Sequence, residues 1–134
     1  MKANGVLLFM VFACALMACC ISAKEDFLGN NMYLSEYNNV DRRILYQKES
    51  CATTGTQIVP MTVLEIAHDA HWIIAKSGNK RQQNDYKYWV IKNNYDSIPD
   101  AKTVEENTIE FDSYDLFIAY LKDNRIHLEL ERLE

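Results

Sequence analysis

The sequence predicts an α+β domain in which a curved antiparallel sheet of about six strands packs against one helix that precedes the last strand. Three observations lead to this expectation. Short segments alternate between apolar and polar residues, Gly, Asn and Asp mark the turns between them, and one late segment has helical spacing. A small β-barrel or sandwich is the alternative arrangement. At 134 residues the chain has room for a single domain.

The first half of the domain is expected to begin with a hairpin. Residues 32–37 alternate, and residues 43–48 alternate again after a turn marked by Asn38, Asn39 and Asp41. Residues 50–56 are small and polar and predict a loop. Pro60 cannot donate a hydrogen bond to a neighbouring strand, so it is expected at a strand start, an edge or a bulge.

The middle of the chain predicts three further strands. Residues 61–67 and 72–76 are joined by a tight turn at His68-Asp69-Ala70. After a polar loop over residues 77–85, residues 86–92 are aromatic and β-branched almost throughout, which favours a strand.

The last third of the chain holds the expected helix. Asp100 is expected to cap a helical turn over residues 101–107, and Asp112 is expected to cap the main helix. The main helix has one apolar stripe, formed by Tyr114, Phe117, Ile118 and Leu121. A final strand is predicted from the alternation of Ile126, Leu128 and Leu130 with polar residues.

The first residues have the pattern of a bacterial lipoprotein signal. Lys2 precedes an apolar run over residues 6–17, and Leu16-Met17-Ala18-Cys19 matches a lipobox. Cys19 is therefore the expected lipidation site, because its thiol forms the thioether to diacylglycerol. Cys20 as the modified residue and an uncleaved membrane helix are the alternatives. The predicted divisions are a signal peptide over 1–18, a lipidated tether over 19–31 and a β-rich domain over 32–134.

This leader predicts a location in the cell envelope, with the domain anchored to a membrane by its acyl chains and facing the periplasm or the cell surface. Cleavage before Cys19 would remove Lys2 and change the formal net charge from −5 to −6. An acidic domain of this kind is not expected to bind nucleic acid.

Three cysteines would remain after cleavage. With Cys19 lipidated, Cys20 and Cys51 are available for a disulfide bond in an oxidising compartment. The equally weighted alternative is that Cys51 is a lone small residue in the core.

Charge is unevenly distributed along the domain. Residues 72–92 carry a formal charge of +4, and residues 93–134 carry −7. The basic segment is also aromatic, and amphipathic patches of this composition anchor protein interfaces. The candidate partner-binding patch comprises Lys76, Lys80, Arg81, Lys87, Tyr86 and Tyr88.

The sequence offers few candidates for catalysis or metal binding. His68-Asp69-Ala70-His71 has two imidazoles and a carboxylate, but zinc requires three or four convergent ligands. His127, Glu129 and Glu131 share one face of the predicted last strand, as the residues of a solvent-facing strand would. Cys51 lies in no nucleophile motif. No catalytic residue, metal site or cofactor is therefore predicted.

The chain resembles a group of small, uncharacterised lipoproteins of Gram-negative gut anaerobes. The resemblance rests on Trp72-Ile73-Ile74-Ala75-Lys76, on Tyr88-Trp89-Val90-Ile91-Lys92 and on residues 112–117. It implies the fold and the envelope location and transfers no catalytic residue. The function expected from the sequence is protein binding without catalysis, in its sharpest form an inhibitor or immunity-type protein that caps a periplasmic toxin or hydrolase. The alternative is a structural or assembly lipoprotein of an envelope complex, and a small enzyme is the least favoured hypothesis.

Overall fold

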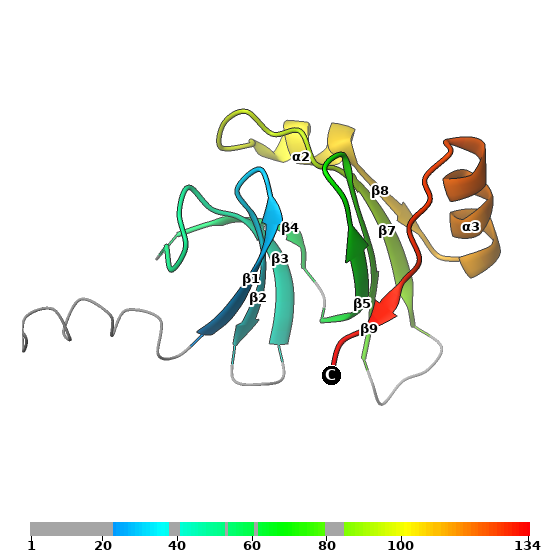
Figure 1. Cartoon of the computed structure of the whole chain (residues 1–134), viewed down its shortest axis with the longest axis horizontal. Helices are drawn as coiled ribbons and strands as arrows, with labels where there is room; N and C mark the ends of the chain where they lie inside the picture. Colours follow the sequence, from blue (N-terminus) through cyan, green and yellow to red (C-terminus); the bar gives the residue numbers. More distant parts are fainter. Residues whose placement is uncertain (1–22, 38–40, 53, 61, 80–84) are drawn as a thin grey trace, which may run out of the picture.

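In the part of the chain that the structure describes, two antiparallel sheets and two short helices form a β-rich α+β fold (Figure 1). The computed structural model describes residues 23–37, 41–52, 54–60, 62–79 and 85–134. The predicted class is thus confirmed, but the single sheet is wrong. The strands divide into sheets of four and five, and they do not close into a barrel.

The first sheet contains strands β1 to β4 in sequence order. Its strands are β1 (Ala23–Gly29), β2 (Met32–Tyr37), β3 (Asp41–Tyr46) and β4 (Thr56–Val59). The β1–β2 turn has positive φ at Asn30 (46°) and Asn31 (61°), as in type I′ hairpin turns. Pro60 follows β4 directly, consistent with the expectation that it lies at an edge.

The second sheet has the order β8-β7-β6-β5-β9. Its strands are β5 (Val63–His68), β6 (Trp72–Ser77), β7 (Lys87–Lys92), β8 (Thr108–Phe111) and β9 (Glu131–Arg132). Strands β6 and β7 are paired on both sides and confirm the predictions for residues 72–76 and 86–92 to within one residue at each end.

The two sheets share one apolar core. Strands β2, β3 and β4 contribute Met32, Ile44 and Val59, and these pack in one cluster with residues such as Ile73 and Ile91 of the second sheet. Trp89 lies in the same cluster and donates from its indole nitrogen to the hydroxyl of the fully buried Ser77 at 2.8 Å. Figure 1 shows the first sheet on one side of this core and the second sheet on the other.

The opposite face of the second sheet is covered by helix α3 (Tyr114–Asp123). Phe117 and Leu121 of α3 are buried against Ile74 and Val90. The helix confirms the predicted apolar stripe in part, because Tyr114 and Ile118 remain largely exposed. The predicted cap at Asp112 is wrong by one residue: the N-cap is Ser113, whose side chain makes no capping hydrogen bond.

Helix α2 (Ala101–Asn107) connects β7 to β8 and begins as predicted. The side chain of Asp100 accepts a hydrogen bond from the Thr103 backbone at 2.8 Å. This bond holds the pKa of the Asp100 carboxyl below its usual range.

Two predictions at the ends of the domain are wrong. Residues 23–31 are not a tether, because residues 23–29 form β1 and pair with β2. The predicted final strand is reduced to Glu131 and Arg132, since only these residues pair with β5. Ile126 is buried and Leu128 and Leu130 are half-buried against the α3 cluster, so packing accounts for their alternation without a strand.

Candidate functional site

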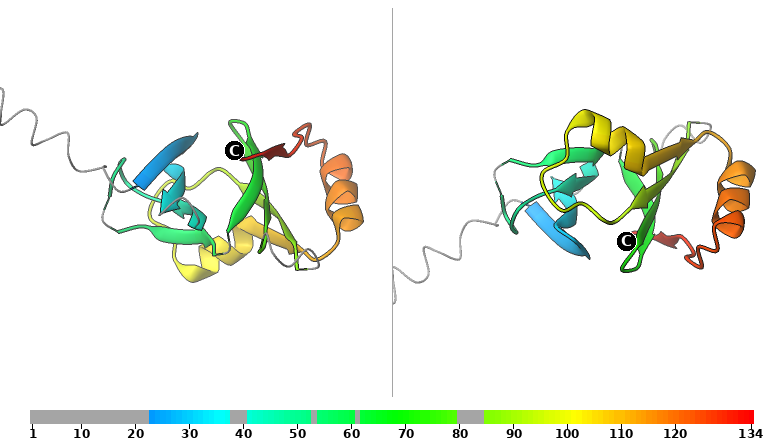
Figure 2. Two further views of the ribbon diagram at one scale, coloured as in Figure 1. Left: turned by 90° about the horizontal axis from the view of Figure 1, so that it is seen from below. Right: turned by 90° about the horizontal axis from the view of Figure 1, so that it is seen from above.

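A groove of about 570 Å³ lies between the two sheets at their free edges. Both views in Figure 2 show β1 and β9 on the same side of the molecule. Strands β1 and β2 supply one wall, and β5 with the C-terminal segment supplies the other. The lining residues are Asp26, Leu28, Leu34, Ile66, Ala67, His68, His127, Leu128, Glu129, Glu131 and Leu133.

Hydrogen bonds tie the sheets together at both ends. At the end with the β1–β2 and β5–β6 hairpins, the buried side-chain amide of Asn93 donates to the backbone oxygen of Leu28 at 2.8 Å, and the backbone oxygen of Asn93 accepts from the side-chain amide of Asn30. At the other end, Arg42 of β3 donates to the backbone oxygen of Glu134. Arg42 is only 7% exposed and also pairs with Glu36 at 3.2 Å. The spacing of the two sheet edges is therefore fixed by the fold.

The groove combines an apolar floor with acidic walls. Asp26, Glu129 and Glu131 form no ion pair within the described part of the chain, and no Lys or Arg lines the groove. His68 and His127 lie on the wall opposite Asp26. No serine, threonine, tyrosine or cysteine is among the described lining residues, so the groove holds none of the usual hydroxyl or thiol nucleophiles.

The structure brings together some of the sequence candidates for metal binding and separates others. His127, Glu129 and Glu131 line the groove with His68, as the sequence alone could not show. Asp69 instead accepts hydrogen bonds from the backbones of His71 and Trp72, at 2.7 and 2.8 Å, and so fixes the β5–β6 turn. Among the described residues, no group of three His, Cys, Asp or Glu side chains is arranged to hold a metal ion.

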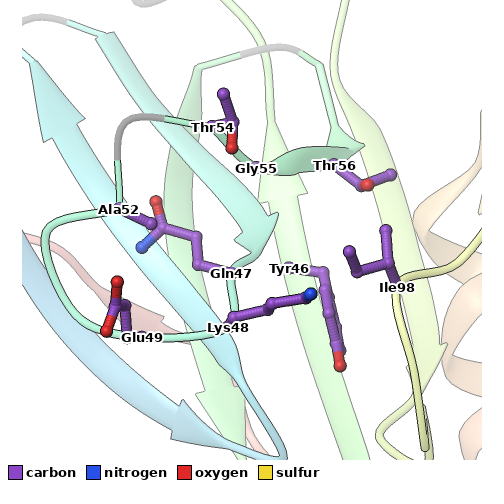
Figure 3. A pocket seen from close by; sticks show the side chains of 9 residues that line it. All are labelled: Tyr46, Gln47, Lys48, Glu49, Ala52, Thr54, Gly55, Thr56 and Ile98. Atoms are coloured by element: carbon purple, nitrogen blue, oxygen red, sulfur yellow. The ribbon is translucent and has the colours of Figure 1, made fainter.

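A second hollow, of about 360 Å³, lies between the β3–β4 loop and the segment after β7 (Figure 3). It is lined by Tyr46, Gln47, Lys48, Glu49, Ala52, Thr54, Gly55, Thr56 and Ile98. In Figure 3 the Lys48 side chain extends toward Tyr46, and Ile98 forms the opposite rim. Ile98 is 55% exposed, so this hollow is an open surface feature and not an enclosed pocket.

The β3–β4 loop is fixed to β1 by one carboxylate. Glu25 accepts hydrogen bonds from the Gln47 side chain at 3.1 Å, the Ser50 hydroxyl at 3.3 Å and the Cys51 backbone at 2.8 Å. Cys51 is disulfide-bonded, which is inconsistent with a lone core cysteine or a free thiol nucleophile. Its partner lies outside the described residues, so pairing with Cys20 stays a prediction.

The described residues of the predicted partner-binding patch are not all exposed on one surface. Lys76 pairs with Glu65 at 3.3 Å and lies 4.2 Å from the centre of the Tyr86 ring. Tyr88 is buried, and its ring stacks on Phe117 at 5.3 Å. Lys87 precedes Tyr88 on β7 and so points to the opposite face of the sheet.

Lys87 is also engaged within the chain. Its amine contacts Asp112 and Glu110, and the hydrogen bonds that it donates to these two carboxylates raise the pKa of Lys87. Lys80 and Arg81 of the patch lie outside the described residues, as do Cys19 and Cys20. The patch as a whole remains a prediction.

Asp26 and Leu28 are two groove residues in a segment that the sequence analysis did not assign to the fold. Both lie in the segment predicted as a tether, although the Asn30-Asn31 pair is a turn signal that favours a hairpin there. In the described part of the chain, no helix is long and apolar enough to cross a bilayer.

Neither a curated protein nor a solved structure matches this chain. A family model described as "Protein of unknown function (DUF3997)" matches residues 29–122. The match extends from the end of β1 nearly to the end of α3, and so covers most of both sheets and the core between them. The chain therefore belongs to the DUF3997 family.

Proposed function

We propose that this protein is a lipid-anchored binding protein of the cell envelope without catalytic activity, and in its sharpest form an inhibitor or immunity-type protein that caps a periplasmic toxin or hydrolase. The observation that carries the proposal is the position of the lipobox relative to the fold. β1 begins at Ala23, so only three residues separate it from Cys19. Four residue steps span at most about 14 Å. A lipid on Cys19 would hold the first sheet close to the membrane surface.

Two features of the domain support binding over catalysis. The groove between the sheets presents carboxylates and imidazoles without a hydroxyl or thiol nucleophile among its described lining residues. It is also held open by ties at both ends, and preformed surfaces of this kind lower the entropic cost of binding a partner.

Lipidation is tested with Cys19→Ala in the full-length chain, expressed in a Gram-negative host and labelled with an alkyne analogue of palmitate. We expect the variant to lose the label and to leave the membrane fraction, because the proposal places the thioether on the Cys19 thiol and not on Cys20. Cys20→Ala is the matched control and should keep both. Continued membrane association of Cys19→Ala would contradict the assignment.

Binding is tested by crosslinking the lipidated full-length protein in intact envelopes, followed by affinity capture and mass spectrometry. We expect one envelope or imported protein to be enriched in an equimolar complex that survives dilution. A lipoprotein of similar net charge, expressed in parallel, controls for nonspecific retention. No enrichment above that control would remove the main support for a binding role.

A further inference from the structure

Strand β1 has a free edge, and this edge forms one rim of the groove. β1 is the terminal strand of the first sheet within the described part of the chain. An edge strand directs alternate N–H and C=O groups away from its sheet, where they can pair with another strand. Leu28 lies at the irregularity of the β1–β2 ladder, and its backbone oxygen accepts from Asn93, so the regular part of the edge is the stretch before Leu28.

The facing edge of the second sheet is covered only in part. β9 pairs with β5 at Glu65 and Ile66, and the pairing does not continue to Ala67 and His68. The β1 edge of the first sheet and the partly covered β5 edge of the second sheet therefore lie on the same side of the molecule (Figure 2). One further strand along β1 would extend the first sheet across the opening.

The side chains around β1 define what such a strand would carry. A strand added to β1 would have one face toward the groove and the other toward solvent. The groove side presents Asp26, Glu129 and Glu131, which lack ion pairs in the described structure. On the outer side, Phe27 is 60% exposed, and its ring is held against Tyr33 at a centroid distance of 5.2 Å.

We propose that the β1 edge binds an extended segment of a partner protein by strand addition, and that this segment alternates basic residues with apolar residues. The basic side chains enter the acidic groove, and an apolar side chain on the other face packs on Phe27. Main-chain hydrogen bonds to β1 supply affinity, and the alternating side chains supply specificity. This proposal rests on the protein-binding function proposed above and names the chemistry of the partner.

The direct test uses three synthetic nine-residue peptides with blocked ends and a fluorescent label. One alternates lysine and valine, one has glutamate in place of every lysine, and one has the same lysines and valines grouped into two blocks. Fluorescence anisotropy with the full-length protein in detergent gives the three dissociation constants. We expect the alternating lysine peptide to bind at least about ten-fold more tightly than the other two.

Variants locate the binding. In Asp26→Lys/Glu129→Lys, which reverses two groove charges, we expect the affinity for the alternating peptide to fall at least about ten-fold. Glu105→Lys/Glu106→Lys reverses two charges on the exposed surface of α2 and is the matched control, with an unchanged affinity. Amide hydrogen exchange of the wild-type protein gives a readout that does not depend on a folded variant. The bound peptide should slow exchange at residues 24–27.

Three results would overturn the proposal: equal binding of the alternating and block peptides, protection confined to segments other than β1, or self-association of the protein through β1. The crosslinking experiment separates this proposal from the proposed function. A natural partner retained equally by wild type and by Asp26→Lys/Glu129→Lys refutes the edge as the binding site and leaves the binding function standing. Retention of no partner refutes the binding function itself.

Discussion

Replacement of Phe117 by alanine tests whether α3 forms an integral third layer of the fold. Phe117 is fully buried, and the centre of its ring lies 5.3 Å from that of Tyr88 and 6.0 Å from that of Phe111. Only Phe117 and Leu121 of α3 are buried, so Phe117 is one of the two side chains that anchor the helix. Truncation of a buried phenylalanine typically costs 3–5 kcal/mol. Because α3 lies at the outside of the molecule and can settle inward, we expect about 3 kcal/mol.

The measurement is urea unfolding followed by tryptophan fluorescence, which reports on both cores because Trp72 packs against the α3 cluster and Trp89 lies between the sheets. Leu116→Ala is the control, since Leu116 is on the same helix but 63% exposed, and we expect a change within about 0.5 kcal/mol. Phe117→Leu, which retains most of the volume, should lose about 1 kcal/mol and remain measurable if the alanine variant unfolds. A loss below about 1 kcal/mol for Phe117→Ala, or an equal loss for Leu116→Ala, would refute this account of how α3 is held.

Three further predictions concern polar groups. Asn93→Ala should cost about 1–3 kcal/mol in urea unfolding, because the buried backbone oxygen of Leu28 loses its donor; an unchanged midpoint would contradict the tie between the sheets. Burial raises the pKa of Tyr95, so its neutral form is favoured in the folded state. The neutral Tyr95 side chain therefore contributes to the free energy of unfolding below pH about 10, and this contribution is lost as pH rises. Tyr95→Phe should reduce the fall in melting temperature at alkaline pH. The lowered pKa of Asp100 gives the opposite pH dependence: the ionised carboxylate stabilises the folded state at neutral pH, and this stabilisation is lost below about pH 4. Asp100→Ala should therefore reduce the acid dependence of the melting temperature.

Sequence patterns located the inner strands because those strands have neighbours on both sides. Ile73 and Ile91 are fully buried, and their segments carry β-branched and aromatic residues that pack in either core. β1 lacks this pattern, since Lys24, Glu25 and Asp26 follow one another. An edge strand can carry such polar residues. Glu25, for example, accepts the hydrogen bonds that fix the β3–β4 loop. The hydropathy of this segment therefore predicts a tether and not the strand that forms.

The C-terminal segment shows the converse error. Ile126, Leu128 and Leu130 alternate as in a strand, but alternation reports which residues are covered and not which backbone groups are paired. Here the apolar residues pack against the α3 cluster while the backbone forms a ladder only at residues 131–132. The short ladder also leaves part of β5 uncovered, so the same departure from a regular strand helps to create the groove.

The groove itself depends on contacts that a single sequence does not reveal. Asp26 and Glu129 lie near opposite ends of the described part of the chain and meet only because the two sheets pack through Met32, Ile44 and Ile73. Periodicity assigns each residue to a face of its own element, but it does not specify which faces meet. His127, Glu129 and Glu131 were correctly placed on an exposed surface, whereas their proximity to His68 and Asp26 required the three-dimensional structure.

The position of β1 links the proposed anchor to the proposed binding edge. A lipid on Cys19 would place the start of β1 at the membrane, together with the C-terminus of the chain, which Arg42 holds at the same end of the groove. The Asn30–Asn93 tie would then lie at the far end, away from the bilayer. β1 would run outward between these points, so its free edge would face sideways into the periplasm or the medium. An extended segment of a partner could therefore reach the edge without displacing lipid, because strand addition needs access along β1 and none to its anchored end.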